Sequence, residues 1–327
     1  MNILVTGGAG YIGSHTCKLL YKHGFTPIVF DNLSTGNKNF VKWGPLVIGD
    51  LSDYSLIRKT IREYNIQAVI HFAASAYVGE SMDNPRKYFY NNTVNTLNLI
   101  NAMEDENLKK IVFSSTCATY GIPEEVPIRE SFEQKPINPY GESKLMIERI
   151  LHWYGNAYGL RYVSLRYFNA AGADPEIEIG ELHDPETHLI PIVIEAALGQ
   201  REFVEVYGTD YPTPDGTAIR DYIHVMDLAS AHVLSLKYLL DGGDSVYLNL
   251  GTGKGFSVRQ VIRAVERLSG KKINVRNAKR RQGDPAVLVA NPDLAKDLLG
   301  WEPLYQDIET IIDTAWQWAR RRSSFES

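Results

Sequence analysis

A glycine-rich turn near the start of the chain constrains the fold more than any other stretch. Asn2 to Thr6 is a β-branched apolar run, Gly7 to Gly13 (GGAGYIG) follows at once, and Ser14 to Lys22 has a helical pattern. Glycines at this spacing let a turn pass close to a pyrophosphate, and the following helix directs free N–H groups at the phosphates. The stretch predicts strand, turn and helix around a dinucleotide. Gly8, Gly10 and Gly13 match the spacing G-x-G-x-x-G. Gly7, Gly10 and Gly13 match the spacing G-x-x-G-x-x-G.

The next strand specifies the dinucleotide. Pro27 to Phe30 is apolar and ends in Asp31, 18 residues after Gly13. A carboxylate there can accept a hydrogen bond from the adenosine 2′-hydroxyl and would repel the 2′-phosphate of NADP. The chain is therefore predicted to bind NAD. The alternative is a glycine turn with a purely structural role.

Strands and helices alternate through the first half of the chain. Further strands are predicted at 46–49, 68–72, 111–115 and 162–167, with helices between them. This alternation predicts an α/β fold, a doubly wound parallel sheet whose ligands collect beyond the carboxyl ends of the strands. The two longest helices are predicted at Asn84 to Met103 and at Pro139 to Tyr158.

The composition of the sequence changes beyond residue 168, where prolines and glycines become frequent. We expect residues 1–168 to form the NAD-binding domain, rejoined by about 222–251, and 169–327 to form a smaller C-terminal α/β substrate-binding domain. Tyr222 to Leu240 reads as a helix and Val246 to Leu250 as a strand.

Composition excludes several classes of protein. The 327 residues carry a formal net charge of −5, which argues against nucleic acid or an anionic membrane as partner. Cys17 and Cys117 lie far apart and the histidines form no H-x-x-x-H pair, so no metal is predicted. The chain shows neither a secretory leader nor a membrane-length apolar run, and we expect it in the cytoplasm.

The most informative chemical motif is Tyr140-Gly141-Glu142-Ser143-Lys144. Residues four apart on a helix share one face, and among the 19 tyrosines only Tyr140 has a lysine at that position. Bringing a phenol pKa from about 10 to neutrality requires about 4 kcal/mol, which two nearby cations in a dry pocket can supply. Because Thr116 ends the preceding strand, we favour a catalytic pair over an ordinary helical surface pair.

Five stretches together resemble the extended short-chain dehydrogenase/reductases with a Rossmann-type sheet, and specifically the UDP-glucose 4-epimerase family. They are GGAGYIG, YGESK, LRYFNAAG, DGTAIRDYIHVMDLA and RRQGD, and the resemblance runs from residue 1 to about Trp318. It implies inversion at carbon-4 of a UDP-sugar by transient oxidation with tightly bound NAD. Tyr140 would take the proton of the 4-hydroxyl as phenolate, with Thr116 bonded to the same oxygen. Lys144 would hold the nicotinamide ribose and keep Tyr140 ionised.

The resemblance also implies contact residues and a homodimer formed through the helices near Asn84 to Met103 and Pro139 to Tyr158. Asp284 would accept from a sugar hydroxyl, and the two arginines, Arg220 and Arg281, would bind the pyrophosphate as forks. Taken alone, each arginine could equally make a surface salt bridge, and His188 could simply be packed. The cofactor contacts are Gly7, Gly10, Tyr11, Ile12, Gly13, Asp31, Asn32, Asp50, Leu51, Phe72, Ala73, Ala74, Asn91, Tyr140, Lys144 and Phe168, and the substrate contacts are Thr116, Asn169, His188, Leu189, Tyr207, Arg220, Arg281, Asp284 and Leu288.

Three positions depart from the family pattern. Thr116 stands where many members have serine, Ala76 where many hexose epimerases have lysine, and Leu288 where a tyrosine restricts N-acetylated sugars. UDP-N-acetylglucosamine and UDP-xylose/UDP-arabinose epimerisation are therefore alternatives. A sugar dehydratase would need an Asp-Glu pair where Cys117 and Ala118 stand. A non-catalytic NAD sensor would not need the Tyr-Lys pair.

Overall fold

A seven-stranded parallel sheet forms the larger part of the computed structural model, which describes residues 1–281 and 283–326. The strand order is β10-β6-β5-β4-β1-β2-β3. The switch in order between β1 and β4 opens the crevice in which such sheets bind ligands. The strands span Asn2–Thr6 (β1), Thr26–Asp31 (β2), Leu46–Ile48 (β3), Ile66–His71 (β4), Lys110–Ser114 (β5), Arg161–Tyr167 (β6) and Val246–Leu250 (β10).

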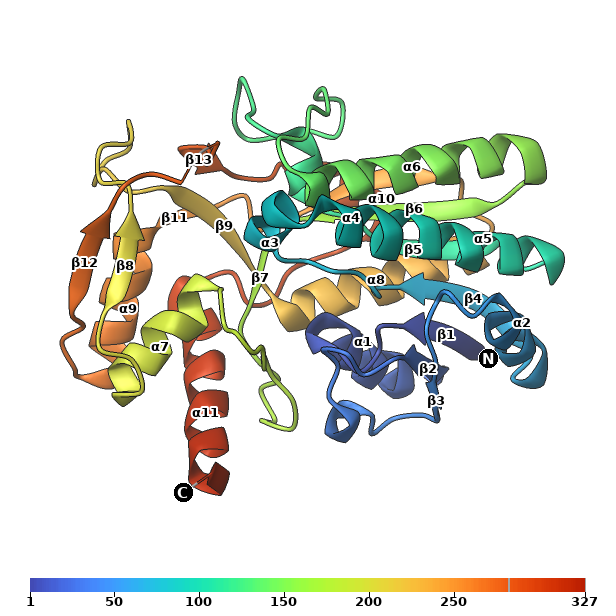
Figure 1. The fold of residues 1–327 in the computed structure, drawn as a ribbon, viewed down its shortest axis with the longest axis horizontal. Coiled ribbons are helices and arrows are strands. Elements are labelled where there is room, and N and C mark those ends of the chain that lie inside the picture. The colour runs from blue at the N-terminus through green and yellow to red at the C-terminus, as the bar shows by residue number, and fades with distance from the viewer. Residues whose placement is uncertain (282, 327) are drawn as a thin grey trace.

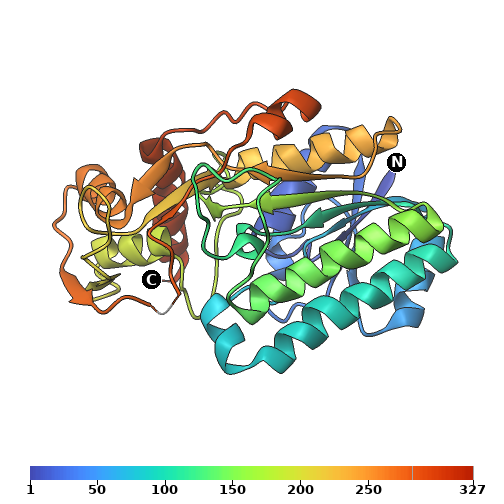
Figure 2. The same cartoon turned by 90° about the horizontal axis from the view of Figure 1, so that it is seen from above.

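Helices cover both faces of this sheet, because alternate strand residues such as Ile3 and Leu4 bury their side chains on opposite sides. Figure 2 shows α5 and α6 on one side and α8 on the other. The predicted doubly wound α/β fold is confirmed. The helices span Tyr11–Lys22 (α1), Tyr54–Glu63 (α2), Val78–Asp83 (α3), Pro85–Tyr88 (α4), Asn95–Asp105 (α5), Pro139–Tyr158 (α6), Val225–Leu240 (α8) and Asp293–Leu299 (α10), with short turns at Lys38–Phe40 (η1), Phe89–Val94 (η2) and Cys117–Tyr120 (η3).

A smaller α/β part lies beside the carboxyl edge of the large sheet (Figure 1). Strand β9 pairs with β7, β11 and β13, and β8 pairs with β12. Because β10 and α8 return to the large sheet, the chain passes between the two parts more than once. The elements span Asn169–Ala171 (β7), Leu189–Leu198 (α7), Val204–Tyr207 (β8), Ile219–His224 (β9), Gly255–Ser257 (β11), Val258–Ser269 (α9), Val275–Ala278 (β12), Val287–Leu288 (β13) and Ile308–Glu326 (α11).

Two predicted helices have different bounds in the structure. The expected helix from Asn84 to Met103 is interrupted by the π-helical turn η2, and the expected helix from Tyr222 begins only at Val225. Residues 222–224 are instead the end of β9, where they pair with β7. Both differences arise from partners distant in sequence, which a local pattern does not reveal.

Candidate active site

The glycine turn joins β1 to α1 as predicted, and its glycines are required by close packing. Gly7 has φ of +72°, and a Cβ there would lie 2.6 Å from the backbone nitrogen of Ala73. A Cβ at Gly13 would lie 2.2 Å from the carbonyl oxygen of Gly7. Helix α1 starts after Gly10, which has no side chain to cap it. Its first N–H groups are therefore suited to an anionic ligand.

Asp31 ends β2 directly beneath this turn. Its carboxylate accepts hydrogen bonds from the N–H groups of Ala9 (3.0 Å) and Leu33 (2.8 Å). Burial raises the pKa of Asp31, and these two bonds oppose that shift. The same carboxylate thus orders the turn and presents an acceptor at the predicted ribose position.

Other predicted cofactor residues gather at neighbouring strand ends. The Asn32 amide donates to Asp50 at 2.7 Å, and Leu51 is buried beside them. The N–H groups of Phe72 and Ala73 both donate to the carbonyl of Thr6 (2.9 and 3.1 Å), which draws the end of β4 against the end of β1. Of the other predicted cofactor contacts, Ile12 lies on α1 and Ala74 lies in the loop after β4.

Tyr11 has a role that its position in the motif did not reveal. Its hydroxyl donates to the carbonyl oxygen of Gly172 at 2.6 Å, and its ring lies edge-on to His15 and His183. The first residue of α1 therefore links the glycine turn to the segment after β7.

Thr116 and Tyr140 meet where β5 ends and α6 begins. The Thr116 hydroxyl lies near enough to the Tyr140 phenol to favour its ionisation by hydrogen bonding, and Thr116 Oγ1 also accepts from the Ala118 N–H at 3.1 Å. Asn138 caps α6 by accepting from the Gly141 N–H at 2.8 Å. A Cβ at Gly141 would lie 2.5 Å from the carbonyl oxygen of Ala118, so this glycine lets α6 approach the turn that carries Thr116.

The pKa of Tyr140 depends on what surrounds the phenol. Burial raises the pKa of the phenol in the chain by itself, and the hydrogen bond with Thr116 only opposes this. The lowered pKa expected with two cations nearby concerns the site with NAD bound, and it stays a prediction. Ionising Tyr140 at neutral pH requires a further positive charge beside the ring.

Lys144 lies one turn further along α6 and is buried. Its ammonium donates to the carbonyl oxygen of Ser114 at 2.9 Å and stands over the Phe113 ring at 5.0 Å. Burial lowers the pKa of Lys144 to about 7. The ammonium therefore gains from any partner that solvates its charge, such as a ribose hydroxyl.

The π-helical turn η2 positions a residue that the sequence did not single out. Asn92 accepts from the Ser75 N–H at 2.8 Å and donates to Ser143 Oγ at 3.0 Å. The predicted contact Asn91 donates to Ser75 Oγ at 3.1 Å. Asn92 thus ties the loop after β4 to the helix that carries Tyr140, as π-helical turns often do at functional sites.

A buried ion pair also went unnoticed in the sequence. Arg166 on β6 donates to Glu148 on α6 at 2.7 Å, and Ser115 Oγ donates to the same carboxylate at 2.6 Å. Ser115 immediately precedes Thr116. This network therefore fixes the end of β5 relative to the helix that carries Tyr140.

The predicted substrate residues lie mainly in the smaller part of the chain. Arg220 forms an ion pair with Asp284, and the guanidinium of Arg281 lies 4.1 Å from the centre of the Tyr207 ring. Leu288 on β13 is paired with Arg220 on β9. The structure thus pairs Arg220 with Asp284 and Arg281 with Tyr207, and their role as substrate contacts stays a prediction.

The other predicted substrate and nicotinamide residues approach from β7 and α7. Phe168 is buried in a cluster with Tyr120, and Cys117 and Leu288 pack against that cluster, while Asn169 begins β7. His188 is the N-cap of α7 and Leu189 its first residue. Desolvation raises the pKa of the Cys117 thiol to about 12, so it is not suited to the acid-base role of a dehydratase carboxylate.

Comparison with known proteins gives a consistent result. The NAD dependent epimerase/dehydratase family model matches residues 3–251. A UDP-glucose 4-epimerase of Rhizobium meliloti (strain 1021) is 53% identical over 322 residues, 98% of either chain. The structure of UDP-glucose 4-epimerase from Brucella ovis in complex with NAD has 53% identity and a TM-score of 0.95, with 97% of both chains covered. A UDP-glucose-4-epimerase from Stenotrophomonas maltophila, with bound NAD and formylated UDP-arabinopyranose, has 40% identity and a TM-score of 0.96 over 99% of both chains.

The chain belongs to the NAD dependent epimerase/dehydratase family. The parallel sheet agrees with this class, and full-length identity near 50% places the chain among its UDP-glucose 4-epimerases. The resemblance found in the sequence is thereby confirmed.

Proposed function

We propose that the chain is an NAD-dependent isomerase that interconverts UDP-galactose and UDP-glucose by inversion at carbon-4. The observation that carries this proposal is the meeting of Thr116 and Tyr140 at the carboxyl edge of the sheet, with Lys144 one turn further along α6. The fit of NAD rests on the uncapped N–H groups at the start of α1 and on the acceptor Asp31.

The chain's own residues control one proton. NAD, when bound, supplies reversible oxidation at carbon-4 and a positive nicotinamide charge. Tyr140 takes the proton of the 4-hydroxyl and returns it when the inverted alcohol forms. Thr116 orients that oxygen and stabilises the phenolate by its hydrogen bond. Lys144 is placed to bind the ribose and to add positive charge near the phenol.

The substrate side of the proposal rests on charge and shape. Arg220 and Arg281 can each bind a diphosphate oxygen pair as a planar fork, and Asp284 can accept from a sugar hydroxyl. When the substrate binds, Arg220 would contact the diphosphate and Asp284 the sugar hydroxyl while the two side chains remain neighbours. His188 and Asn169 complete the set at the ends of α7 and β7.

The direct test of the proposal is conversion. Purified protein is incubated with NAD and UDP-galactose, and UDP-glucose is measured by NMR. We expect the equilibrium mixture of both sugars. Absence of UDP-glucose with NAD bound would overturn the proposal and favour a sensor.

UDP-N-acetylglucosamine is a second candidate substrate because Leu288 is smaller than tyrosine and packs beside Phe168. We expect Leu288→Tyr to reduce turnover of UDP-N-acetylglucosamine more than turnover of UDP-glucose or UDP-xylose. Steady-state kinetics of all three nucleotide sugars would define the substrate range.

We also propose a homodimer formed through η2, α5 and α6, acting in cytoplasmic galactose metabolism. Tyr90, Val94, Met146 and Trp153 are large apolar side chains that these helices expose. Such a surface is expected to be covered in solution. Sedimentation as a monomer would refute the dimer. In the described residues, none of the helices is long and apolar enough to cross a membrane.

A further inference from the structure

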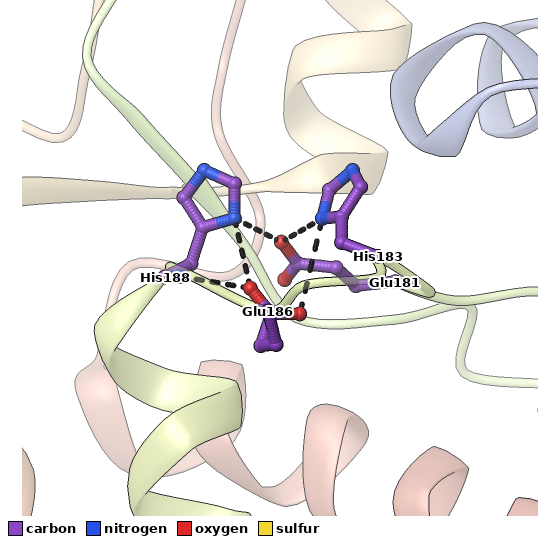
Figure 3. Close-up of side chains that lie close together, drawn as sticks. All are labelled: Glu181, His183, Glu186 and His188. Carbon is purple, nitrogen blue, oxygen red and sulfur yellow. Dashed lines mark hydrogen bonds and ion pairs between the residues drawn. The ribbon is translucent and has the colours of Figure 1, made fainter. Parts of the chain in front are cut away.

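Four potential metal ligands converge in the loop between β7 and α7. They are Glu181, His183, Glu186 and His188, spaced E-x-H-x-x-E-x-H (Figure 3). One donor atom from each lies within 4.8 Å of the others. Only His188 belongs to the proposed substrate site. The prediction that the chain binds no metal rested on the absence of H-x-x-x-H, a helical spacing that says nothing about a loop.

Four of the donor separations are close to those around a tetrahedral ion. Nδ1 of His188 lies 2.7 Å from Glu181 Oε1 and 3.2 Å from Glu186 Oε1. Nδ1 of His183 lies 3.1 Å from Glu181 Oε1 and 3.8 Å from Glu186 Oε2. Metal–ligand bonds of about 2.0–2.2 Å at tetrahedral angles place neighbouring donors roughly 3.4 Å apart. Because the four donor atoms are as much as 4.8 Å apart, side chains of the loop would have to move by about 1 Å to bind the ion.

The charges of the cluster also suit a divalent cation. The Glu181 and Glu186 side chains are 7% and 8% exposed, and both face the two imidazoles. Buried carboxylates need a counter-charge, which the ion pair with protonated His188 supplies when no ion is bound. A divalent ion would displace that proton, and two carboxylates with two neutral imidazoles would leave the site neutral.

Surrounding contacts hold the ligands in place. The N–H groups of Thr187 and His188 donate to Glu186 Oε1 at 2.7 and 2.8 Å. The Trp318 indole N–H donates to the Glu181 carbonyl at 2.9 Å. The rings of Tyr11 and Tyr77 lie edge-on to His183. Such supporting contacts orient ligands before an ion binds.

We propose that Glu181, His183, Glu186 and His188 bind one divalent transition-metal ion of the Zn²⁺ class. Two imidazole nitrogens favour Zn²⁺ over Mg²⁺ or Ca²⁺, which prefer oxygen ligands. Four protein ligands would fill the tetrahedral coordination of the ion and leave no open position for a substrate, so the site would be structural. Because Tyr11 contacts both His183 and Gly172, the ion would hold this loop against the start of α1.

The test uses full-length protein without an affinity tag, stripped of metal by a chelator. Zn²⁺ alone is titrated by calorimetry, and Co²⁺ reports tetrahedral coordination through its visible absorption. We expect one ion per chain and a higher melting temperature with Zn²⁺. His183→Gln and Glu181→Gln should each weaken binding at least about tenfold.

The matched control is His152→Gln, which removes an exposed histidine on α6 outside the cluster. It should bind Zn²⁺ like the native chain. Circular dichroism of each variant establishes that it is folded. The proposal is overturned if the native chain binds no Zn²⁺ at micromolar concentration, or if His183→Gln and His152→Gln bind it equally. These readouts do not depend on turnover, so failure here leaves the epimerase proposal intact.

Discussion

Tyr140 carries the proposed chemistry, and its surroundings explain why it needs help to do so. Burial disfavours the phenolate, while Thr116 is the neighbour whose hydrogen bond favours it. The protein alone therefore keeps the phenol protonated, and the base forms only in the assembled site. The contributions of Tyr140 and Thr116 to turnover can therefore be measured separately by mutating each side chain.

Replacing Tyr140 with Phe removes the proton acceptor and little else. We expect turnover of UDP-galactose to fall about 10²- to 10⁴-fold, since a positioned acid-base group contributes that much. NAD should remain bound, which absorbance of the purified protein can check. A variant with near-normal kcat would show that the base is another residue.

Replacing Thr116 with Val removes a hydrogen bond to the phenolate. Such a bond stabilises a charged group by about 1.5–3 kcal/mol, so kcat should fall roughly 10- to 100-fold. The pKa of Tyr140 rises without it, and because the base must be deprotonated, the acidic limb of the pH profile should move to higher pH. Thr116→Ser keeps the hydroxyl and should behave like the native chain. An unmoved acidic limb in Thr116→Val would argue against the phenolate.

At the scale of elements, the site depends on how α6 is held against the strand ends. Glu148 on α6 is bonded to Arg166 on β6 and to Ser115 at the end of β5. Asn92 on η2 makes a second tie, through Ser143. Together they set the relative positions of Thr116 and Tyr140.

Glu148→Gln tests the buried tie. It leaves the Arg166 guanidinium buried without its carboxylate, which should lower the free energy of unfolding by about 3–5 kcal/mol in urea. The matched control is Glu309→Gln, which breaks the exposed pair with Arg267 and should cost less than about 1 kcal/mol. Equal losses in the two variants would mean that the buried pair does not brace α6.

Local sequence signals predicted some elements well and missed others for physical reasons. Helix α6 runs from Pro139 to Tyr158 as predicted, because Asn138 caps it and Gly159 ends it in a left-handed conformation. The π-helical turn η2 was missed because its Asn92 is hydrogen-bonded to Ser75 and Ser143, which are distant in sequence. Thr116 and Tyr140 could be proposed from the sequence because strand-end and helix-face positions can be read locally, and their catalytic role stays a prediction. The Glu181 cluster lies in a loop, where no periodicity marks it.

At the scale of the whole molecule, buried neutral imidazoles link stability to pH. Burial lowers the pKa of each of four histidines. Some of their hydrogen bonds join separate elements, as those of His71 with Thr6 and Thr96 do. Their pKa values are about 4 for His15, about 3 for His71, about 3 for His224 and about 4 for His232.

These histidines should make the fold sensitive to acid. Between pH about 6.5 and about 4 the unfolded chain binds protons that the folded chain does not, so the free energy of unfolding falls as pH falls. Each histidine contributes about 1.4 kcal/mol per pH unit in that window. Urea unfolding at pH 7 and pH 5 should show a loss of several kcal/mol at the lower pH. Equal or greater stability at pH 5 would contradict the neutral assignment.

The central claim is that carbon-4 is inverted by oxidation and return of the same hydrogen, with Tyr140 handling only the hydroxyl proton. Incubating the protein with NAD and UDP-galactose in D₂O tests it, with deuterium at carbon-4 of the UDP-glucose measured by NMR. We predict full epimerisation without deuterium at carbon-4. Deuterium at that carbon would contradict the account, because the hydrogen would then have exchanged with solvent as a proton.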